Sequence, residues 1–190
     1  MKVFLAALAM FMATPAAADF DAASYPPYER CALCHGLSGQ SHSGKFPHLA
    51  GQKPGYILGQ LEAFLSGHRA NDGGQMASIV TELVPDDFAV VVAWFAEQDP
   101  PSPSDSPLVD KGAQLTKDAG CKTCHDGDAS NDIPHLTAQH AVYIAKQMHD
   151  FREGRRTHNQ GAEIHGSMMS NMDKDIDAIA AYLASLERPE

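Results

Sequence analysis

The sequence has little basic charge and, beyond its first residues, no long apolar stretch. Its 190 residues include 14 lysines and arginines against 24 aspartates and glutamates, a formal net charge of −10. Because nucleic-acid binding needs a basic surface facing the phosphates, this balance argues against a nucleic-acid partner. After residue 18 no run reaches the roughly 18 apolar residues that a membrane-spanning helix needs, so no transmembrane segment is predicted there.

The sequence also lacks the strict alternation of apolar and polar residues that marks half-buried strands. Apolar residues recur instead with helical spacing, most clearly over residues 56–65, where they line one face of a helix. Gly67 and Gly154 stand at helix stop positions, and Pro85 with two following aspartates marks the first turn of another helix. The sequence therefore predicts an all-α protein.

Residues 1–18 predict an export signal that is cleaved off. Lys2 gives a short positive start, residues 3–13 are almost wholly apolar, and residues 16–18 are three small alanines. We therefore expect cleavage near Asp19, a mature chain outside the cytoplasm, and no contribution of this segment to the fold.

The remaining chain is an internal repeat. CALCH at residues 31–35 recurs as CKTCH at residues 121–125. Downstream, residues 47–71 match residues 134–158 without gaps at 10 of 25 positions. Each half then ends in an apolar helical pattern in which a tryptophan or a tyrosine takes the same place. Such self-similarity indicates two homologous units.

A stretch rich in proline and serine separates the two units and predicts a linker at residues 100–107. We expect an N-terminal domain over residues 19–99 and a C-terminal domain over residues 108–190. A helical domain of about 80 residues with many loops has few residues for a core, so something else must fill its centre.

The two CxxCH motifs indicate what fills it. Two cysteines three apart and an adjoining histidine are typical of covalent haem attachment, because each thiol adds to one vinyl group while the histidine reaches the iron. The predicted residues are Cys31, Cys34 and His35 in the first half and Cys121, Cys124 and His125 in the second. A disulfide, a redox pair and a zinc site are the alternatives. Two such motifs behind an export signal favour two haem groups.

A methionine is the expected sixth ligand of the first iron. Ligation by histidine and methionine stabilises reduced iron and raises its potential, which suits an electron carrier. Met76 is the single methionine of the mature first half, and it lies between the striped helix and the closing helix. We therefore predict that Met76 and His35 ligate the first iron.

The second half offers several candidates for the same position. Met148 aligns with a core leucine of the first half, and Met172 lies at the start of the closing helix, where an apolar contact is expected. Met168 is therefore the predicted ligand and Met169 the alternative, with Met172 or His165 as further candidates.

Two other repeated pairs have expected roles. Arg69 and Arg156 fit either an ion pair with haem propionates or a solvated helix end. A backbone carbonyl near Pro47 and another near Pro134 are candidate acceptors for the Nδ1–H groups of the haem histidines, which would fix the orientation of each ring.

Two CxxCH units, each followed by PHLxxQxxxYIxxQ, an F(L/R)xG(H/R)R segment and a closing (W/Y)(F/L)A helix, resemble the dihaem cytochrome c4 family over essentially the whole mature chain. The resemblance implies two tandem class I cytochrome c domains related by a pseudo-twofold axis. It also implies that His35 and Met76 ligate one iron, and that His125 and a methionine of the Met168–Met169 pair ligate the other. The loop that contains this last ligand is shorter in the second half than in the first, which departs from the family pattern.

The resemblance further implies a periplasmic or membrane-associated electron carrier with two covalent haem c groups, no catalysis of its own, and a terminal oxidase as electron acceptor. The chain is also similar to the cytochrome subunit of flavocytochrome c sulfide dehydrogenase, so a haem subunit that accepts electrons from a flavoprotein or other enzyme is the alternative. A dihaem peroxidase, which needs an open iron, is a third class. The sequence leaves open the donor, the acceptor and the two potentials.

Overall fold

The structure is a computed structural model that describes residues 25–125, 130–157 and 161–189. The predicted export signal, residues 1–18, lies outside the described residues, and so does His158. Over the described ranges all regular structure is helical, so the all-α prediction is confirmed. None of the helices in these ranges has the length and apolar character needed to cross a membrane.

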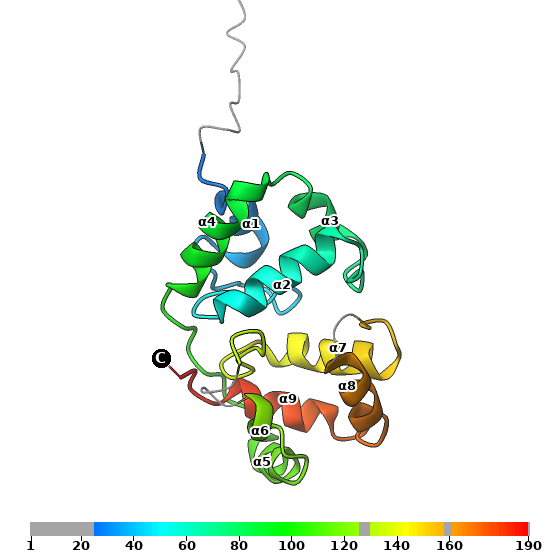
Figure 1. Cartoon of the computed structure of the whole chain (residues 1–190). Coiled ribbons are helices and arrows are strands. Elements are labelled where there is room, and N and C mark those ends of the chain that lie inside the picture. The colour runs from blue at the N-terminus through cyan, green and yellow to red at the C-terminus, as the bar shows by residue number, and fades with distance from the viewer. Residues whose placement is uncertain (1–24, 126–129, 158–160, 190) are drawn as a thin grey trace, which may run out of the picture.

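The first half of the chain forms the upper part of the molecule in Figure 1. Its helices are α1 (Glu29–His35), α2 (Pro54–Leu65), α3 (Gln75–Val80) and α4 (Pro85–Ala96). As expected, α4 begins at Pro85, and the Asp87 carboxylate accepts a hydrogen bond from the Val84 N–H at 3.0 Å. Gly67 follows α2 with φ 74°, a left-handed conformation that favours glycine at a helix end.

The core of the first half lies where α2 packs against α3 and α4. Its buried residues are Cys31, Ile57, Leu61, Phe64, Val80, Leu83, Val91, Val92 and Phe95. The apolar stripe predicted over residues 56–65 divides in the structure. Ile57, Leu61 and Phe64 enter this core, whereas Tyr56 and Gln60 accept hydrogen bonds from Arg156 of the second half of the chain.

The second half forms the lower part of the molecule. Its helices are α5 (Val109–Asp118), α6 (Lys122–His125), α7 (Ala141–Arg152), α8 (Gly161–Ser170) and α9 (Ile176–Ala184). Helix α9 packs against α5 and α7, and α8 packs against α7. Gly112 lets α5 and α9 approach closely, because a Cβ atom there would lie 1.9 Å from the Ala178 carbonyl oxygen.

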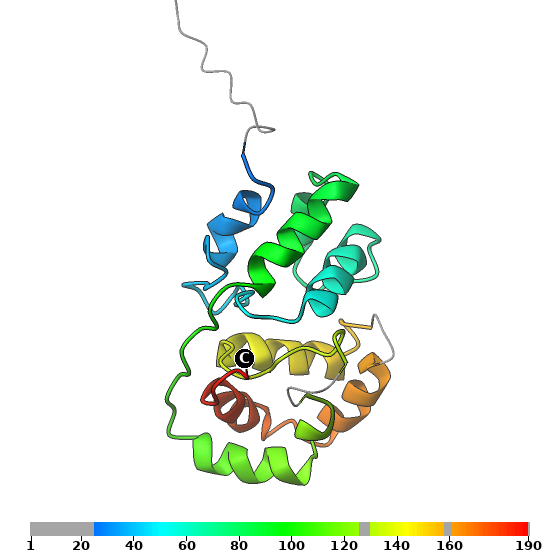
Figure 2. The same ribbon diagram turned by 60° about the vertical axis from the view of Figure 1, so that its left-hand side comes forward.

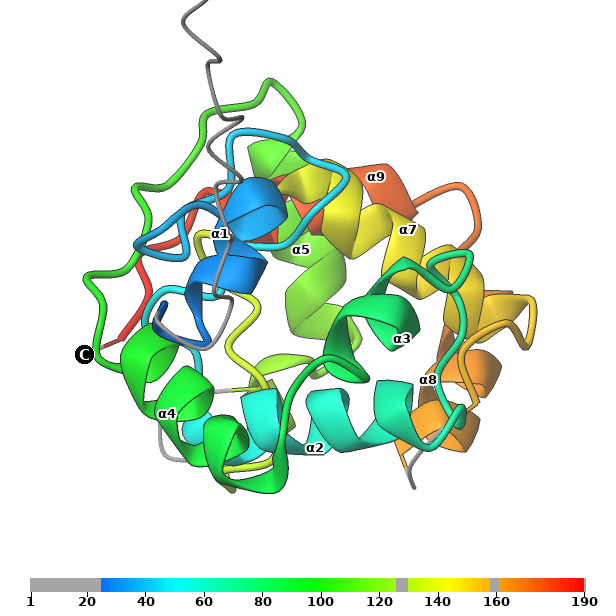
Figure 3. The same ribbon diagram turned by 90° about the horizontal axis from the view of Figure 1, so that it is seen from above.

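One extended connection joins the two halves. Residues 99–106 have no regular structure and run down one side of the molecule from α4 to α5 (Figure 2). The predicted linker at residues 100–107 overlaps this stretch, and the linker and the domain boundaries at residues 99 and 108 stay predictions. Seen from above, the helices of the first half lie over those of the second (Figure 3).

The two halves meet with α2 facing α7, and two glutamines hold this interface in a reciprocal way. Gln139 accepts a hydrogen bond from the His48 N–H at 2.8 Å and donates to the His48 carbonyl at 2.9 Å. Gln52 makes the same pair of bonds with the His135 N–H at 2.9 Å and the His135 carbonyl at 3.0 Å. The two sets are offset by 87 residues along the chain, which is the register of the repeat. The halves are therefore related by a pseudo-twofold arrangement.

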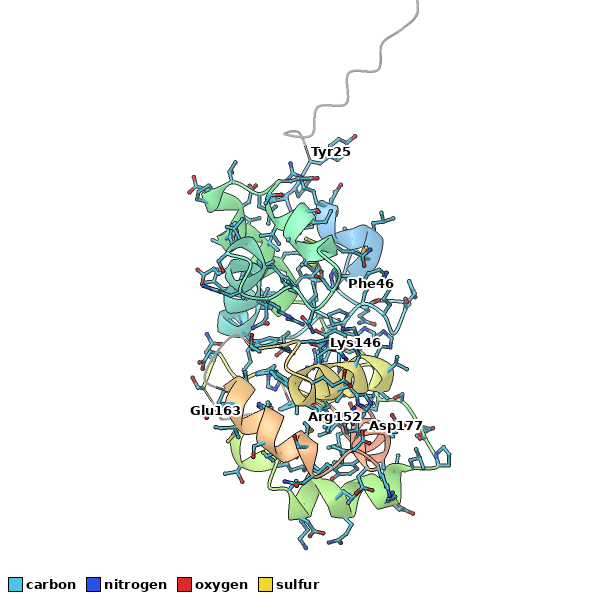
Figure 4. The ribbon with its side chains drawn as sticks, turned by 90° about the vertical axis from the view of Figure 1, so that its right-hand side faces the viewer. Tyr25, Phe46, Lys146, Arg152, Glu163 and Asp177 are labelled. Atoms are coloured by element: carbon cyan, nitrogen blue, oxygen red, sulfur yellow. The ribbon has the colours of Figure 1, made fainter. Side chains whose placement is uncertain are left out.

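Asp150 closes one end of the interface. Its carboxylate is 1 % exposed and accepts hydrogen bonds from Asn71 of the first half at 2.6 Å, from Arg155 at 2.8 Å and from Lys146. Lys146 also donates to the Asn71 carbonyl at 2.8 Å, and Figure 4 shows it on α7 at the boundary of the two halves. Burial raises the pKa of Asp150, but the hydrogen bonds from Lys146, Asn71 and Arg155 lower it by more than burial raises it. The net shift of the pKa is therefore downward.

Candidate haem sites

Helix α1 presents the first CxxCH motif to the interior. Cys31 and His35 are four residues apart and therefore share one face of the helix, and they are 7 % and 4 % exposed. Cys34 is half-buried, and its carbonyl accepts a hydrogen bond from the Ser41 hydroxyl at 3.1 Å. Gly36, with φ 77°, ends the helix directly after the histidine. The motif is thus one short helix whose inner face carries a thiol and an imidazole.

The two nitrogens of His35 have different surroundings. Nδ1 lies 2.9 Å from the Pro47 carbonyl oxygen, to which it donates, and this confirms the acceptor expected near Pro47. Nε2 is buried and has no hydrogen-bond partner. Burial lowers the pKa of His35, although the bond to Pro47 opposes the shift, so the ring is neutral near pH 7. A neutral imidazole with Nδ1–H bonded and a free Nε2 lone pair is what a metal ion requires of a histidine.

Met76 lies in the first turn of α3. Its N–H donates to the Asp72 carboxylate at 2.6 Å, which fixes the start of the helix. The half-buried side chain packs against the core cluster that contains Cys31. The structure therefore brings the predicted sixth ligand and the first CxxCH motif to the same apolar cluster.

The second motif lies in a more open setting. Cys121 precedes the short helix α6, which carries Cys124 and His125; Cys124 is exposed and the other two are half-buried. Nδ1 of His125 donates to the Pro134 carbonyl at 2.9 Å, so the acceptor expected near Pro134 is also confirmed. Burial lowers the pKa of His125, the bond to Pro134 opposes this, and the neighbouring His165 lowers it further.

Helix α8 carries the candidate sixth ligands of the second half. Met169 is 3 % exposed, Met168 is half-buried, and Met172 beyond the helix packs against the core cluster of the second half. The ring that lies beside His125 belongs to His165, with the two ring centroids 5.8 Å apart. The ring of Phe151 stacks in turn on that of His165, with the two ring centroids 4.9 Å apart.

The alternatives to haem find little support in the geometry. All four cysteines are free thiols, so neither CxxC pair forms a disulfide. In residues 25–125, 130–157 and 161–189, no group of three or more histidine, cysteine, aspartate or glutamate side chains could hold a metal ion between them. Burial raises the pKa of Cys31 to about 11, with Arg30 opposing and Cys34 adding to the shift, so this thiol is protonated near pH 7. The donor set fits a porphyrin-bound iron, which needs one histidine and one further ligand from the chain.

One of the two roles expected for the repeated arginines is ruled out by the structure. Arg69 and Arg156 are each 5 % exposed, so the solvated helix end is wrong, while the pairing with haem propionates stays a prediction. Arg69 donates to Gln60 at 2.6 Å, and across the interface to the Tyr143 hydroxyl at 3.0 Å and to Gln147 at 2.9 Å. The physical reason is that the docking of the two halves covers the arginine and supplies uncharged oxygen acceptors from the opposite helix.

Arg156 makes the equivalent set of bonds in the other direction across the interface. It donates to Gln147 at 2.9 Å, to the Tyr56 hydroxyl at 3.1 Å and to Gln60 at 3.1 Å. Sequence reasoning missed that these glutamines and tyrosines build the interface. The signal was present, because tyrosine, glutamine and arginine are among the identical positions of the repeat.

Comparison with known proteins agrees with this picture. The family model described as cytochrome c matches residues 109–187. The chain is 36 % identical over 169 residues to cytochrome c4 of Pseudomonas aeruginosa, covering 82 % of this chain and 83 % of that protein. It is 30 % identical to the thiosulfate dehydrogenase electron acceptor of Stutzerimonas stutzeri, over 87 % of this chain and 82 % of that protein. The crystal structure of reduced cytochrome c4 from Pseudomonas stutzeri superposes with a TM-score of 0.74 at 30 % identity, covering 85 % and 97 % of the two chains.

Proposed function

Because the chain belongs to the cytochrome c4 family, we propose that it is a periplasmic electron carrier that delivers electrons to a terminal oxidase. Membership of this family confirms the two-domain class I cytochrome c fold and the two covalently bound haem c groups. It also identifies the protein as an electron-transfer cytochrome. The periplasmic location, the oxidase partner and the individual ligands belong to the proposal.

The buried, unpartnered Nε2 of His35 is the observation that carries the proposal. Leaving a polar atom buried without a partner costs about 1–3 kcal/mol, which coordination of an iron atom would offset. In the proposed first site Cys31 and Cys34 would bind the haem covalently, and His35 and Met76 would ligate its iron. Bound haem takes up and releases one electron at its iron.

The chain's own residues set the conditions for this electron exchange. The Pro47 carbonyl holds the His35 ring in one tautomer and one orientation, which keeps Nε2 available and the imidazole a good donor. The Pro134 carbonyl does the same for His125, beside the attachment residues Cys121 and Cys124. Burial of the first motif excludes water and favours the less charged, reduced state of the site.

The acidic surface suits a carrier that meets basic partners. With a net charge of −10, the chain would be attracted to a basic docking patch, and transfer between separate proteins should slow as salt screens the attraction. The same charge also favours solubility. Measuring the rate of transfer against ionic strength distinguishes the two roles.

A second candidate function is supported by one comparison. The similarity to a thiosulfate dehydrogenase electron acceptor favours a haem subunit that takes electrons directly from an oxidoreductase. This is the alternative given by the sequence, in which a flavoprotein or other enzyme is the electron donor. The two functions differ in the protein that exchanges electrons fastest with the haems.

The deciding experiment uses exported holoprotein. The pyridine haemochrome spectrum should count two c-type haems per chain, and cell fractionation should recover the protein from the periplasm. Oxidation of the reduced protein by oxidase-containing membranes is then compared with reduction of the oxidised protein by thiosulfate dehydrogenase plus thiosulfate. Fast oxidation with slow reduction supports the oxidase pathway, the reverse supports the acceptor subunit, and fewer than two haems refutes both.

The Met76 ligand has its own test. The Met76→Ala change should reduce the weak red absorption band that ferric methionine-ligated haem shows, while the haem content stays at two. Met148→Leu is the matched control, because Met148 packs against the core of the second half and leucine keeps most of its volume. A band of full strength in Met76→Ala would show that another residue ligates the first iron.

A further inference from the structure

The ring beside His125 is an imidazole from the second turn of α8. The ring centroids of His125 and His165 are 5.8 Å apart, and the two ring planes make an angle of 60°. In the first half the aromatic ring nearest His35 belongs to Phe46, with centroids 6.1 Å apart, and α3 supplies a methionine. The two halves therefore differ in what the helix before the closing helix brings to the CxxCH histidine.

Both histidines use the same nitrogen, Nδ1, for a hydrogen bond to a backbone carbonyl. Nδ1 of His125 is bonded to the Pro134 carbonyl at 2.9 Å, and Nδ1 of His165 to the Gly161 carbonyl at 2.5 Å. A carbonyl accepts a hydrogen bond and cannot donate one, so each Nδ1 carries the proton. Nε2 is then the atom of each ring through which such histidines bind a metal.

The spacing of the rings fits one iron atom between them. Two metal–nitrogen bonds of about 2 Å and the radii of two imidazole rings place the centroids of a bis-histidine iron about 6 Å apart. The observed separation is 5.8 Å. Phe151 stacks on His165 with centroids 4.9 Å apart and an angle of 22°, which holds the second ring in place.

The register of the repeat leads to the same residue. Met76 lies seven residues after Arg69 and eighteen before Trp94. The same steps from Arg156 and from Tyr182 end at residues 163 and 164, directly before His165. Met168 lies four or five residues further along, so it departs from the register by a full helical turn.

The methionines in and directly after α8 are the other candidates for the second iron. Met169 is almost fully buried, and Met172 packs against the core cluster around Ile144 and Ile179. Met168 is three residues after His165 and shares its face of α8, so it is the one rival for the same iron. Figure 4 shows this helix beside α7, with Glu163 marking its first turn.

We propose that His165, in place of Met168, is the sixth ligand of the second haem, so that the chain combines one histidine–methionine haem with one bis-histidine haem. The proposal rests on the two haem sites of the proposed function and adds an ordering to them. Methionine ligation raises a haem potential, so the second haem has the lower potential of the two. Electrons that enter at the second haem then pass downhill to the first.

The first test is proton nuclear magnetic resonance of the reduced wild-type holoprotein. The methyl group of a methionine bound to low-spin ferrous haem is shifted far upfield by the ring current of the porphyrin. We expect one such methyl resonance for two haems, and Met76→Ala should remove it. Two upfield methyl resonances in the wild type would overturn the proposal without any variant.

Variants of α8 give the second test. His165→Met should produce a second upfield methyl resonance, double the red absorption band of the oxidised protein, and bring the lower potential close to the higher one. Met168→Leu and Met169→Leu, which replace the two methionines that the sequence favours, should each change none of these. If either change removes a methyl resonance or halves the red band, then that methionine is the ligand and the proposal is wrong.

A haem count in the same samples separates this proposal from the one on which it rests. Two haems with two methionine resonances refute the His165 ligand and leave the electron-carrier function intact. Fewer than two haems refute the haem assignment, and with it both proposals. If His165→Met does not fold, the count of resonances in the wild type still decides.

Discussion

Truncation of one interface glutamine tests whether the two halves depend on each other for stability. Gln139 is buried and bonded to both backbone groups of His48, at 2.8 Å and 2.9 Å. In Gln139→Ala the N–H and the carbonyl of His48 lose their partner from the other half. Because Gln52 makes the same pair of bonds to His135, Gln52→Ala should have nearly the same effect.

The magnitude follows from the backbone groups left unpaired, which are three in each variant because Gln139 also accepts from the His140 N–H and Gln52 also accepts from the Lys53 N–H. An unsatisfied buried backbone donor or acceptor costs about 1–3 kcal/mol, so each truncation should lower the free energy of unfolding by about 3–9 kcal/mol, with water entry favouring the lower end. The two sites act on one interface, so the double variant should cost less than the sum if the first truncation already separates the halves.

Guanidinium unfolding of the holoprotein, followed by far-ultraviolet circular dichroism and by haem absorbance, measures both effects. The matched control is Gln114→Ala, because Gln114 is exposed on α5 and bonds to Asp118 within its own helix at 2.8 Å. That change should stay within about 0.5 kcal/mol of the wild type. If both interface variants also stay within that limit, the glutamine bonds do not hold the halves together.

Four further substitutions test other features of the fold. Asp150 has a lowered pKa in the folded state, so its contribution to stability is present above the ordinary pKa near 3.8 and is lost as the pH falls toward the folded pKa. The unfolding free energy of the wild type should therefore decrease below about pH 5. The unfolding free energy of Asp150→Asn should be lower than that of the wild type at pH 7 and should change less in acid. Asn71→Ala, which removes the bond from the first half to this carboxylate, should weaken the same acid dependence in a pH series of unfolding curves. Gly112→Ala should destabilise the second half by about 1–3 kcal/mol or more, because its methyl group would overlap Ala178 where α5 crosses α9, and a thermal midpoint equal to the wild type would refute this close contact. Trp94→Phe should cost about 1 kcal/mol through loss of the indole N–H bond to a backbone carbonyl at 2.8 Å, and the same unfolding assay measures it.

The sequence by itself determined the chemistry and the local structure. The CxxCH spacing places two thiols and an imidazole within about one helical turn in whatever fold contains it, so the two covalent haem groups follow from local geometry. The start of α4 at Pro85 and the glycine after α2 follow from the backbone preferences of single residues. The repeat predicted two related units because it compares the chain only with itself.

The tertiary structure alone decided which repeated residues hold the halves together and which side chain lies beside the histidine of each CxxCH motif. The sequence suggests haem propionates or solvent as the partners of Arg69 and Arg156, but their acceptors Tyr143 and Tyr56 come from the opposite half, 74 and 100 residues away along the chain. Helical periodicity identifies the face on which a residue lies, but it contains no information about what packs against that face. For the same reason the sequence favoured a methionine of α8, while the packing of that helix places the ring of His165 next to His125.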